Sequence, residues 1–257
     1  MSRAGKTFIV TGGASGLGLA TVRKLHSEGA NVSIFDRDAE AGQGLVDEFN
    51  KQRIAFFEVD VTDEGVVGDA VQGTVKKFGT LNGIVNCAGL GSATTTVSRD
   101  LKPHHSGIWD FVVKVNTYGT FYCSSHGAAA MAKLPADKDG NRGIIINVAS
   151  VAGIEGQKGQ VAYSASKGAV IGMTLPMARD LARYGIRVMT IAPGIIDTPL
   201  MSLAPEKVRN GLLRQVVYPK RFGKAEEFAH LATSLIDNSY LNGEVIRMDA
   251  GLRFANL

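Results

Sequence analysis

The sequence predicts an α/β protein with a doubly wound parallel sheet, and three observations support this prediction. Short apolar runs alternate with helical patterns along all 257 residues, which is typical of repeated βαβ units. A glycine-rich turn follows the first apolar run, where such a chain passes from strand to helix. No linker, internal repeat or low-complexity tract divides the sequence, so we expect a single domain over residues 1–257.

Seven apolar runs, each too short for a helix, are expected to form strands joined by right-handed crossovers. They cover residues 7–11, 31–35, 54–59, 83–86, 144–148, 187–192 and 244–248. Helical patterns between them predict helices at residues 17–27, 39–51, 64–78, 106–131, 163–183 and 226–235. The charged stretch 134–142, with its Pro and Gly, indicates a surface insertion. Residues 194–218 form a connection long enough to carry helices and to act as a substrate lid.

Composition narrows the class of protein. Hydrophobic residues make up 45% and charged residues 20% of the chain, as in a globular enzyme, and a net charge of +4 does not by itself indicate nucleic acid. No apolar run reaches the ~18 residues that span a bilayer. The two cysteines form neither a disulfide framework nor a metal motif. We therefore expect a soluble intracellular protein without a metal, in the cytoplasm or the mitochondrial matrix.

The turn after the first strand has the spacing G-x-x-x-G-x-G, with glycines at Gly12, Gly16 and Gly18. Backbone N–H groups and the positive end of the following helix bind a pyrophosphate at this place in a doubly wound sheet. Glycines let the backbone approach the phosphates, and Ser15 adds a hydroxyl donor. A purely structural turn would not need three glycines and a serine, so the turn indicates a dinucleotide site.

Asp36 ends the second predicted strand. A carboxylate there accepts a hydrogen bond from a ribose 2′-OH and repels a 2′-phosphate, which favours NAD over NADP. The adjacent Arg37 could instead accept a phosphate, although a solvated loop residue is the more common role for such an arginine. Further candidates for the cofactor site follow the third and fourth strands: Asp60, Val61, Asn86, Cys87 and Ala88.

Tyr163 and Lys167 lie four residues apart, so on a helix they share one face. An ammonium group one turn away favours the phenolate and lowers the tyrosine pKa. Ser150 ends the preceding apolar run and could hold a substrate oxygen while the phenol exchanges its proton. An isolated Tyr-x-x-x-Lys pair is most often a solvated helix face. Its combination with Ser150 and the glycine turn favours a catalytic role.

Together these residues resemble the short-chain dehydrogenase/reductase family over nearly the whole chain. The resemblance implies a Rossmann-type domain with strand order 3-2-1-4-5-6-7, helices on both faces, and a homotetramer. It also implies that Tyr163 is the acid/base, that Lys167 lowers its pKa and binds the nicotinamide ribose, and that Ser150 positions the reacting oxygen. Asn116 matches the family's asparagine that holds a proton-relay water, although it could simply bond its own backbone. Pro193 and Thr198 match the segment that binds the nicotinamide carboxamide.

A closer resemblance, to members of the family that act on 3-hydroxyacyl-CoA, lies in the stretches 142–150, 155–157, 162–194 and 241–246. It implies that Gln157 lies near the substrate. It implies contacts with NAD from Ser15, Leu17, Asp36, Asp60, Val61, Cys87, Ile196 and Thr198. Residues 90–109, which should border the substrate, are the least similar part of the chain.

The leading hypothesis is an NAD-dependent oxidoreductase that interconverts a secondary alcohol and a ketone, with 3-hydroxyacyl-CoA and 3-oxoacyl-CoA as the expected pair. A steroid or sugar dehydrogenase, or a reductase of 3-oxoacyl thioesters, is the alternative, and Asp36 argues against an enzyme driven by NADPH. A scaffold subunit in RNA processing is a more distant alternative, because no RNA-binding motif is found and the charge is only +4.

Two further patterns predict surfaces. The helix expected at 106–131 carries apolar residues beyond one face, which favours an oligomer. Between Lys207 and Lys224 the chain has six basic residues and no acidic one. Such a run could attract the phosphates of CoA, although charge runs are usually solvated helix faces.

Overall fold

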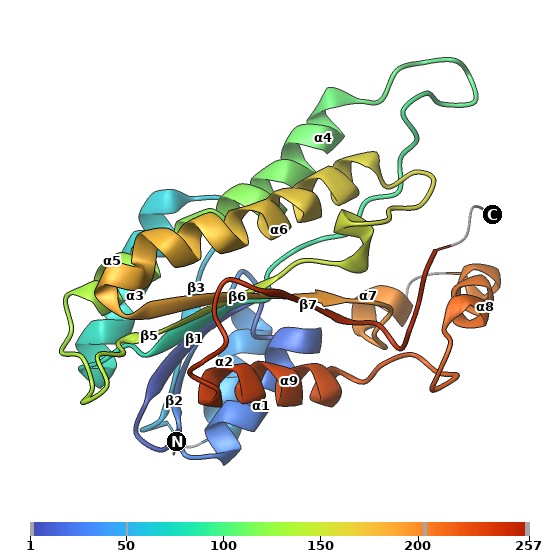
Figure 1. Cartoon of the computed structure of the whole chain (residues 1–257). Helices are drawn as coiled ribbons and strands as arrows, with labels where there is room; N and C mark the ends of the chain where they lie inside the picture. Colours follow the sequence, from blue (N-terminus) through green and yellow to red (C-terminus); the bar gives the residue numbers. More distant parts are fainter. Residues whose placement is uncertain (1–2, 50, 203–204, 255–257) are drawn as a thin grey trace.

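The computed structural model of the chain describes residues 3–49, 51–202 and 205–254. Its centre is a seven-stranded parallel sheet in the order β3-β2-β1-β4-β5-β6-β7 (Figure 1). The strands are β1 (Thr7–Thr11), β2 (Asn31–Asp36), β3 (Ile54–Glu58), β4 (Gly83–Asn86), β5 (Gly143–Val148), β6 (Ile186–Pro193) and β7 (Val245–Met248). The predicted fold class and strand order are therefore confirmed.

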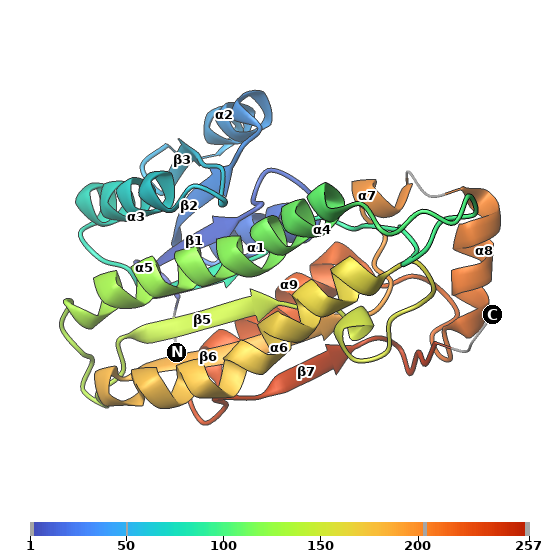
Figure 2. The ribbon, with the colours of Figure 1, turned by 90° about the horizontal axis from the view of Figure 1, so that it is seen from above.

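Helices cover both faces of the sheet (Figures 1 and 2). One face carries α1 (Gly16–Ser27), α2 (Ala39–Glu48) and α9 (Ala225–Asp237). The other carries α3 (Glu64–Phe78), α4 (Ser106–Val113), α5 (Thr120–Ala132) and α6 (Val161–Leu181). Successive side chains of a strand point to opposite faces, so Phe8 and Val10 of β1 enter one core and Ile9 enters the other. This alternation explains why the central strands are continuous apolar runs.

The order of the strands reverses between β1 and β4, which lie side by side at the middle of the sheet. The chain leaves β1 toward one face through α1 and leaves β4 toward the other through α4. The two connections therefore separate above the carboxyl ends of these strands. A doubly wound sheet has its ligand crevice at such a point.

The helix predicted at residues 106–131 contains a feature that the sequence pattern does not indicate. Between α4 and α5 the chain forms a π-helical segment, η1 (Lys114–Gly119). Such segments are rare and occur frequently at functional sites, and this one contains Asn116. The other predicted helices and strands match the observed ones within about three residues, which is the usual uncertainty of element ends.

The long connection after β6 carries two short helices, as expected for residues 194–218: α7 (Pro199–Ser202) and α8 (Glu206–Gln215). Short 3₁₀ turns, η2 (Val151–Gly153) and η3 (Ala182–Tyr184), follow β5 and α6. In the described part of the chain, no helix combines the length and the apolar character that crossing a bilayer requires.

Candidate active site

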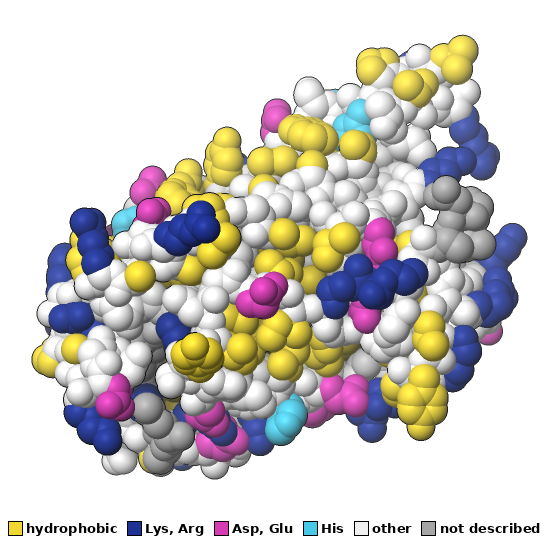
Figure 3. All heavy atoms as spheres, viewed as in Figure 1, with side chains coloured by type: hydrophobic (Ala, Val, Ile, Leu, Met, Phe, Trp, Pro, Cys, Tyr) yellow, Lys and Arg dark blue, Asp and Glu magenta, His cyan; other side chains and the backbone are white. Residues whose placement is uncertain are grey.

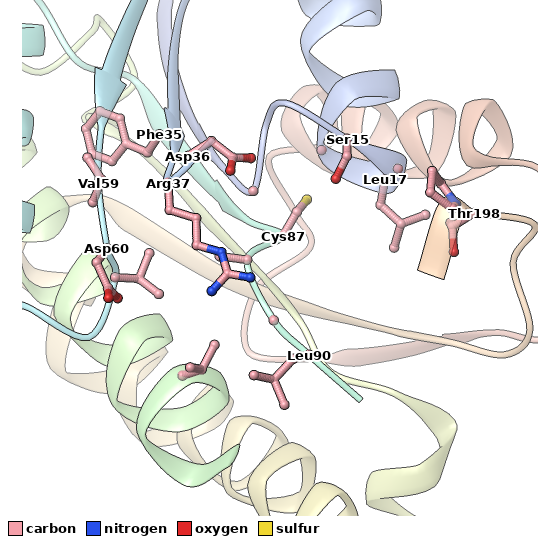
Figure 4. Close-up of a pocket in the computed structure, with 18 of the residues that line it drawn as sticks. Ser15, Leu17, Phe35, Asp36, Arg37, Val59, Asp60, Cys87, Leu90 and Thr198 are labelled. Carbon is pink, nitrogen blue, oxygen red and sulfur yellow. The ribbon is translucent and has the colours of Figure 1, made fainter. Parts of the chain in front are cut away.

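A groove of about 340 Å³ runs across the carboxyl ends of the central strands (Figure 4). Eleven residues that the sequence predicted for cofactor binding line it: Gly12, Ser15, Gly16, Leu17, Gly18, Asp36, Asp60, Val61, Cys87, Ala88 and Thr198. They come from the ends of β1 to β4 and from the connection after β6. The groove therefore lies at the crevice where a doubly wound sheet binds a dinucleotide.

The glycine turn is shaped by close contacts that a side chain would prevent. Gly12 has a positive φ of 61°, and a Cβ there would lie 2.9 Å from the Ala88 backbone in the turn after β4. A Cβ on Gly18 would lie 2.0 Å from the carbonyl oxygen of Gly12. Ser15 precedes α1, and its hydroxyl makes no capping hydrogen bond. The turn thus brings free N–H groups at the start of α1 and a serine hydroxyl to the groove, which fits a pyrophosphate.

Asp36 is fixed at the end of β2 by two backbone donors. Its carboxylate accepts hydrogen bonds from the N–H of Ala14 at 2.9 Å and the N–H of Asp38 at 3.1 Å. Figure 4 shows it directed toward the glycine turn, whereas Arg37 extends across the groove. A carboxylate held in this way retains acceptor capacity for a ribose hydroxyl, so this end of the groove fits the ribose of NAD.

Arg37 is an exposed residue in the loop after β2, as expected, and its side chain also lines the groove. Its charge lies close enough to Asp60 to help lower the pKa of that carboxyl group, after the larger effect of the Thr62 backbone N–H.

Five predicted cofactor residues do not line the groove: Tyr163 and Lys167 lie beside it, and three others lie behind it. The side chain of Asn86 is buried and donates to Ser124 and to Asn147, each at 2.9 Å. Pro193 is buried at the end of β6, and Ile196 is buried against Gly223. Their side chains stabilise the fold behind the crevice, and a contact of their backbone with a cofactor remains a prediction.

Ser150, Tyr163 and Lys167 converge beside the groove. Ser150 precedes η2 and forms a side-chain hydrogen bond with Tyr163, which lies in the first turn of α6. Lys167, one turn further, is only 5% exposed and donates from Nζ to the carbonyl of Val148 at 2.8 Å. Its Nζ lies 6.0 Å from the centroid of the Tyr163 ring. Strand β5 and helix α6 thus bring together the three side chains that the sequence grouped.

The effect of Lys167 on Tyr163 differs from the expectation. Burial raises the pKa of Tyr163, and the hydrogen bond from Ser150 opposes that rise, while Lys167 makes no resolved contribution. Burial also lowers the pKa of Lys167 to about 8. The Lys167 ammonium group donates to the Val148 carbonyl, and its Nζ lies 6.0 Å from the centroid of the Tyr163 ring. In this structure Ser150, and not Lys167, is the group that favours the phenolate.

The side-chain amide of Asn116 makes hydrogen bonds to Leu90 and Ser166, and not to the backbone of its own helix. Its Oδ1 accepts from the N–H of Leu90 and its Nδ2 donates to the Leu90 carbonyl, both at 2.9 Å. The same Nδ2 also donates to Ser166 on α6 at 3.0 Å. A Cβ on Gly89 would lie 3.1 Å from Asn116 Oδ1 and 3.3 Å from Lys167 Nζ. Asn116 therefore holds the turn after β4 against α6, and its role in a proton relay stays a prediction.

The expected substrate residue Gln157 lies in the connection between η2 and α6. Its N–H donates to Gln160 Oε1 at 2.9 Å, which closes a tight turn. Two residues later, the carbonyl of Gly159 accepts from the N–H of Thr94 at 2.7 Å. The connection that carries Gln157 is thus attached to residues 90–109, the segment that was expected to border the substrate.

Several groove residues were missed by reasoning from sequence. They are Phe35, Val59, Gly89, Leu90, Phe111, Val115 and Pro199. Phe111 and Val115 were assigned only to the apolar surface of a helix, and no local signal shows that this helix reaches the groove. The position of Gly89 at the groove could have been predicted, because Gly89 ends the run of small residues after β4.

Comparison with known proteins agrees with this geometry. The profile of the family described as "short chain dehydrogenase" matches residues 6–208. The chain is 48% identical to 3-hydroxyacyl-CoA dehydrogenase type-2 of Bos taurus over 251 residues, which cover 97% of this chain and 95% of that protein. It is 37% identical to the 3-oxoacyl-(acyl-carrier-protein) reductase FabG of Thermotoga maritima, over 96% of this chain and 98% of that protein.

A solved structure extends the likeness to three dimensions. The crystal structure of 3-hydroxyacyl-CoA dehydrogenase type-2 from Mycobacterium avium superimposes with a TM-score of 0.92 at 41% identity, and 98% of each chain is covered. The glycine turn, the Ser150, Tyr163 and Lys167 group, and these relatives lead to one conclusion: the chain belongs to the short-chain dehydrogenases, a family of oxidoreductases.

Proposed function

We propose that the protein oxidises the 3-hydroxyl group of a 3-hydroxyacyl-CoA to a ketone, with NAD as the hydride acceptor. The observation that carries the oxidoreductase part is the convergence of Ser150, Tyr163 and Lys167 beside a groove that fits a dinucleotide. The substrate class is supported by relatives named 3-hydroxyacyl-CoA dehydrogenase type-2, at 46% to 48% identity over 95% or more of this chain.

The chain supplies the proton chemistry and the positioning. The Ser150 hydroxyl hydrogen-bonds the substrate oxygen, and the Tyr163 phenolate accepts the proton that the alcohol loses. Lys167 is buried beside Gly89, which lines the groove, and would hold the ribose of the nicotinamide half of the cofactor there. A bound NAD would supply the hydride acceptor for the carbinol carbon, and the products would be the 3-oxoacyl thioester, NADH and a proton.

The choice of NAD rests on Asp36. Its carboxylate is held toward the glycine turn by two backbone N–H groups, where it would bind the 2′-OH of NAD and repel the additional phosphate of NADP. Arg37, the neighbouring residue that could bind that phosphate, is exposed and extends across the groove, where its charge helps to lower the pKa of Asp60. The arrangement of both side chains favours NAD.

A substrate panel tests the proposal. Initial rates of NADH formation would be measured with 3-hydroxyacyl-CoA thioesters of short and long chain, a steroid alcohol and a sugar alcohol, each with NAD and with NADP. We expect the highest kcat/KM for an acyl-CoA with NAD. Turnover confined to the reduction of 3-oxoacyl thioesters by NADPH would contradict the proposal and support a reductase. RNA binding without turnover would support a scaffold.

We also propose that the protein forms a homotetramer. Apolar side chains remain exposed along α4 and its continuation, where Phe111 is 52%, Tyr118 51% and Phe121 47% exposed (Figure 3). A single domain leaves this surface uncovered, and contiguous apolar patches usually mark interfaces. Sedimentation at micromolar concentration should give the mass of four chains, and a monomeric mass would contradict the proposal.

A further inference from the structure

Arg247, on the edge strand β7, joins parts of the molecule that are far apart in sequence. Its Nη2 lies 2.6 Å from Glu155 Oε1 and also donates to the carbonyl of Leu252 at 2.9 Å. Its Nε donates to Asp249 Oδ2 at 2.7 Å. Arg247 and Glu155 are only 21% and 26% exposed, so water and salt screen this pair less than a surface pair.

Glu155 belongs to the connection that carries the proposed catalytic groups. It lies between Ser150 at the end of β5 and Tyr163 in α6, two residues before Gln157. Among the ion pairs of the described residues, only Glu155–Arg247 ties this connection to another part of the chain. Arg247 therefore supplies the charged contact between this connection and β7.

The second carboxylate partner of Arg247, Asp249, lies against the segment after β6. Asp249 packs so closely on Gly194 that a Cβ on Gly194 would lie 2.8 Å from the Asp249 Cβ. The Gly194 N–H also donates to the carbonyl of Met248 at 2.9 Å. Gly194 begins the connection that reaches the groove at Thr198. Arg247 thus binds two carboxylates. Glu155 lies in the connection between Ser150 and Tyr163, and Asp249 packs on the segment that leads to the groove.

The turn after β7 is held in a conformation that needs such support. Ala250 has a positive φ of 53°, in a region that residues with a side chain rarely adopt. Its carbonyl accepts from the N–H groups of Val217 and Tyr218, each at 3.2 Å, at the end of the connection that carries α7 and α8. Arg247, by binding Asp249 and the Leu252 carbonyl, fixes both ends of this turn.

We propose that Arg247 is a positioning residue for the reaction: it holds the Ser150–Tyr163 connection, through Glu155, at a fixed distance from the segment after β6. The proposal rests on the proposed roles of Ser150 and Tyr163. Arg247 touches neither substrate nor cofactor. It sets the distance between the proton-transferring groups and the groove, and a displacement of about 1 Å at a reacting centre can cost about 100-fold in rate.

The test uses Arg247→Lys and Glu155→Ala, with Glu155→Gln as the conservative variant. A lysine ammonium is a point charge and cannot bridge Glu155, Asp249 and a carbonyl as a guanidinium does, whereas the side-chain amide introduced by Glu155→Gln retains an acceptor oxygen. The readouts are kcat, the dissociation constant of NADH, and the isotope effect with substrate deuterated at the carbinol carbon. The substrate is the alcohol that the wild-type protein oxidises best.

We expect Arg247→Lys and Glu155→Ala to lower kcat by about tenfold and to increase the isotope effect, because hydride transfer becomes more rate-limiting. The double variant should be little worse than either single one, since both changes remove the same contact. Glu155→Gln should recover part of kcat. The dissociation constant of NADH should stay within about twofold of wild type, because the glycine turn and Asp36 are unchanged.

Arg253→Ala is the matched control. Arg253 also pairs with Asp249, at 3.1 Å, but its side chain is 62% exposed and makes no contact with Glu155. We expect wild-type kcat in this variant. A wild-type kcat in Glu155→Ala, or a lower melting temperature in both Glu155→Ala and Arg247→Lys without any change in kcat or isotope effect, would overturn the proposal. Full activity of Tyr163→Phe would instead overturn the proposed chemistry, whatever the Arg247 series gives.

Discussion

The groove formed by β1 to β4 takes its shape from strand ends, whereas the opposite side of the site is made of connections between distant elements. On the first side, the residues that shape the groove lie at the end of a strand or in the turn that follows it: Gly12, Gly18 and Asp36. On the second side, hydrogen bonds join Leu90 to Asn116 and Thr94 to Gly159. Regular structure thus fixes the side proposed to bind the cofactor, and long-range polar contacts fix the side proposed to bind the substrate.

This difference suggests how the two sides respond to change. A substitution on the strand side should alter cofactor affinity or choice and leave the proton chemistry intact. A substitution among the connections should alter turnover and leave cofactor binding intact. The predictions below test whether the two sides separate in this way, in order of the expected effect.

The largest effect is expected from Tyr163→Phe. The phenylalanine keeps the ring shape but removes the group that exchanges the proton, and general acid/base groups typically contribute about 10²–10⁴-fold. We expect kcat to fall by that factor while the dissociation constant of NADH, measured by fluorescence titration, changes little. Retention of most activity would remove Tyr163 from the mechanism, and a parallel loss of NADH binding would contradict the separation of the two sides.

The pH dependence gives a second test of the same residue. Burial raises the pKa of Tyr163, so at neutral pH the phenolate that accepts the proton is a minor form. Oxidation of the alcohol should therefore speed up as pH rises toward that pKa, and Ser150→Ala should move the rise to higher pH, because the serine hydrogen bond opposes the upward shift. A rate of oxidation that is independent of pH up to pH ~9 would contradict this assignment.

A smaller effect, confined to the cofactor, is expected from Asp36→Ala. Hydrogen bonds to a charged group contribute about 1.5–3 kcal/mol, so kcat/KM with NAD should fall by roughly tenfold or more. The value with NADP should rise, because the repulsion of the 2′-phosphate is lost. Arg37→Ala is the matched variant, and we expect it to leave the preference for NAD unchanged. Efficient use of NADP by the wild-type protein would show that Arg37, and not Asp36, governs this end of the groove.

The fold and the cofactor side could be predicted because their signals are local. The spacing of Gly12, Gly16 and Gly18 after an apolar run defines a phosphate turn without knowledge of the rest of the chain. Asp36 ends the next strand, and parallel strands bring their carboxyl ends to one edge of the sheet. Nothing further is required to place these residues in one groove.

Orientation and burial could not be predicted. Asn86 ends a strand at the site, but its side chain turns into the sheet toward Asn147. The pKa of Tyr163 is raised because protein surrounds the phenol. The four-residue spacing between Tyr163 and Lys167 does not reveal this burial. The contact of Glu155 with Arg247 spans 92 residues and depends on the order of β5, β6 and β7. Such features arise only from tertiary packing.

The smallest effect concerns the basic run from Lys207 to Lys224, where the structure changes the prediction. Arg209 pairs with Asp197 at 3.5 Å and stacks on Phe222. Arg221 pairs with Glu227 at 2.7 Å, and Lys220 donates to backbone carbonyls at the end of α8. The partnered residues stabilise the connection itself, so they are poor candidates for binding an anionic substrate.

Lys207 and Arg214 on α8 are exposed and have no ion-pair partner within the described residues. Figure 3 shows basic side chains gathered at this end of the molecule. If they attract the phosphates of CoA, Lys207→Ala combined with Arg214→Ala should raise KM for an acyl-CoA by about three- to tenfold, since exposed charges contribute ~0.2–1 kcal/mol each. The same KM should rise with salt in the wild-type protein, and kcat should not change. An uncharged alcohol substrate is the control, and an equal rise in its KM would show that the two residues act on structure and not on charge.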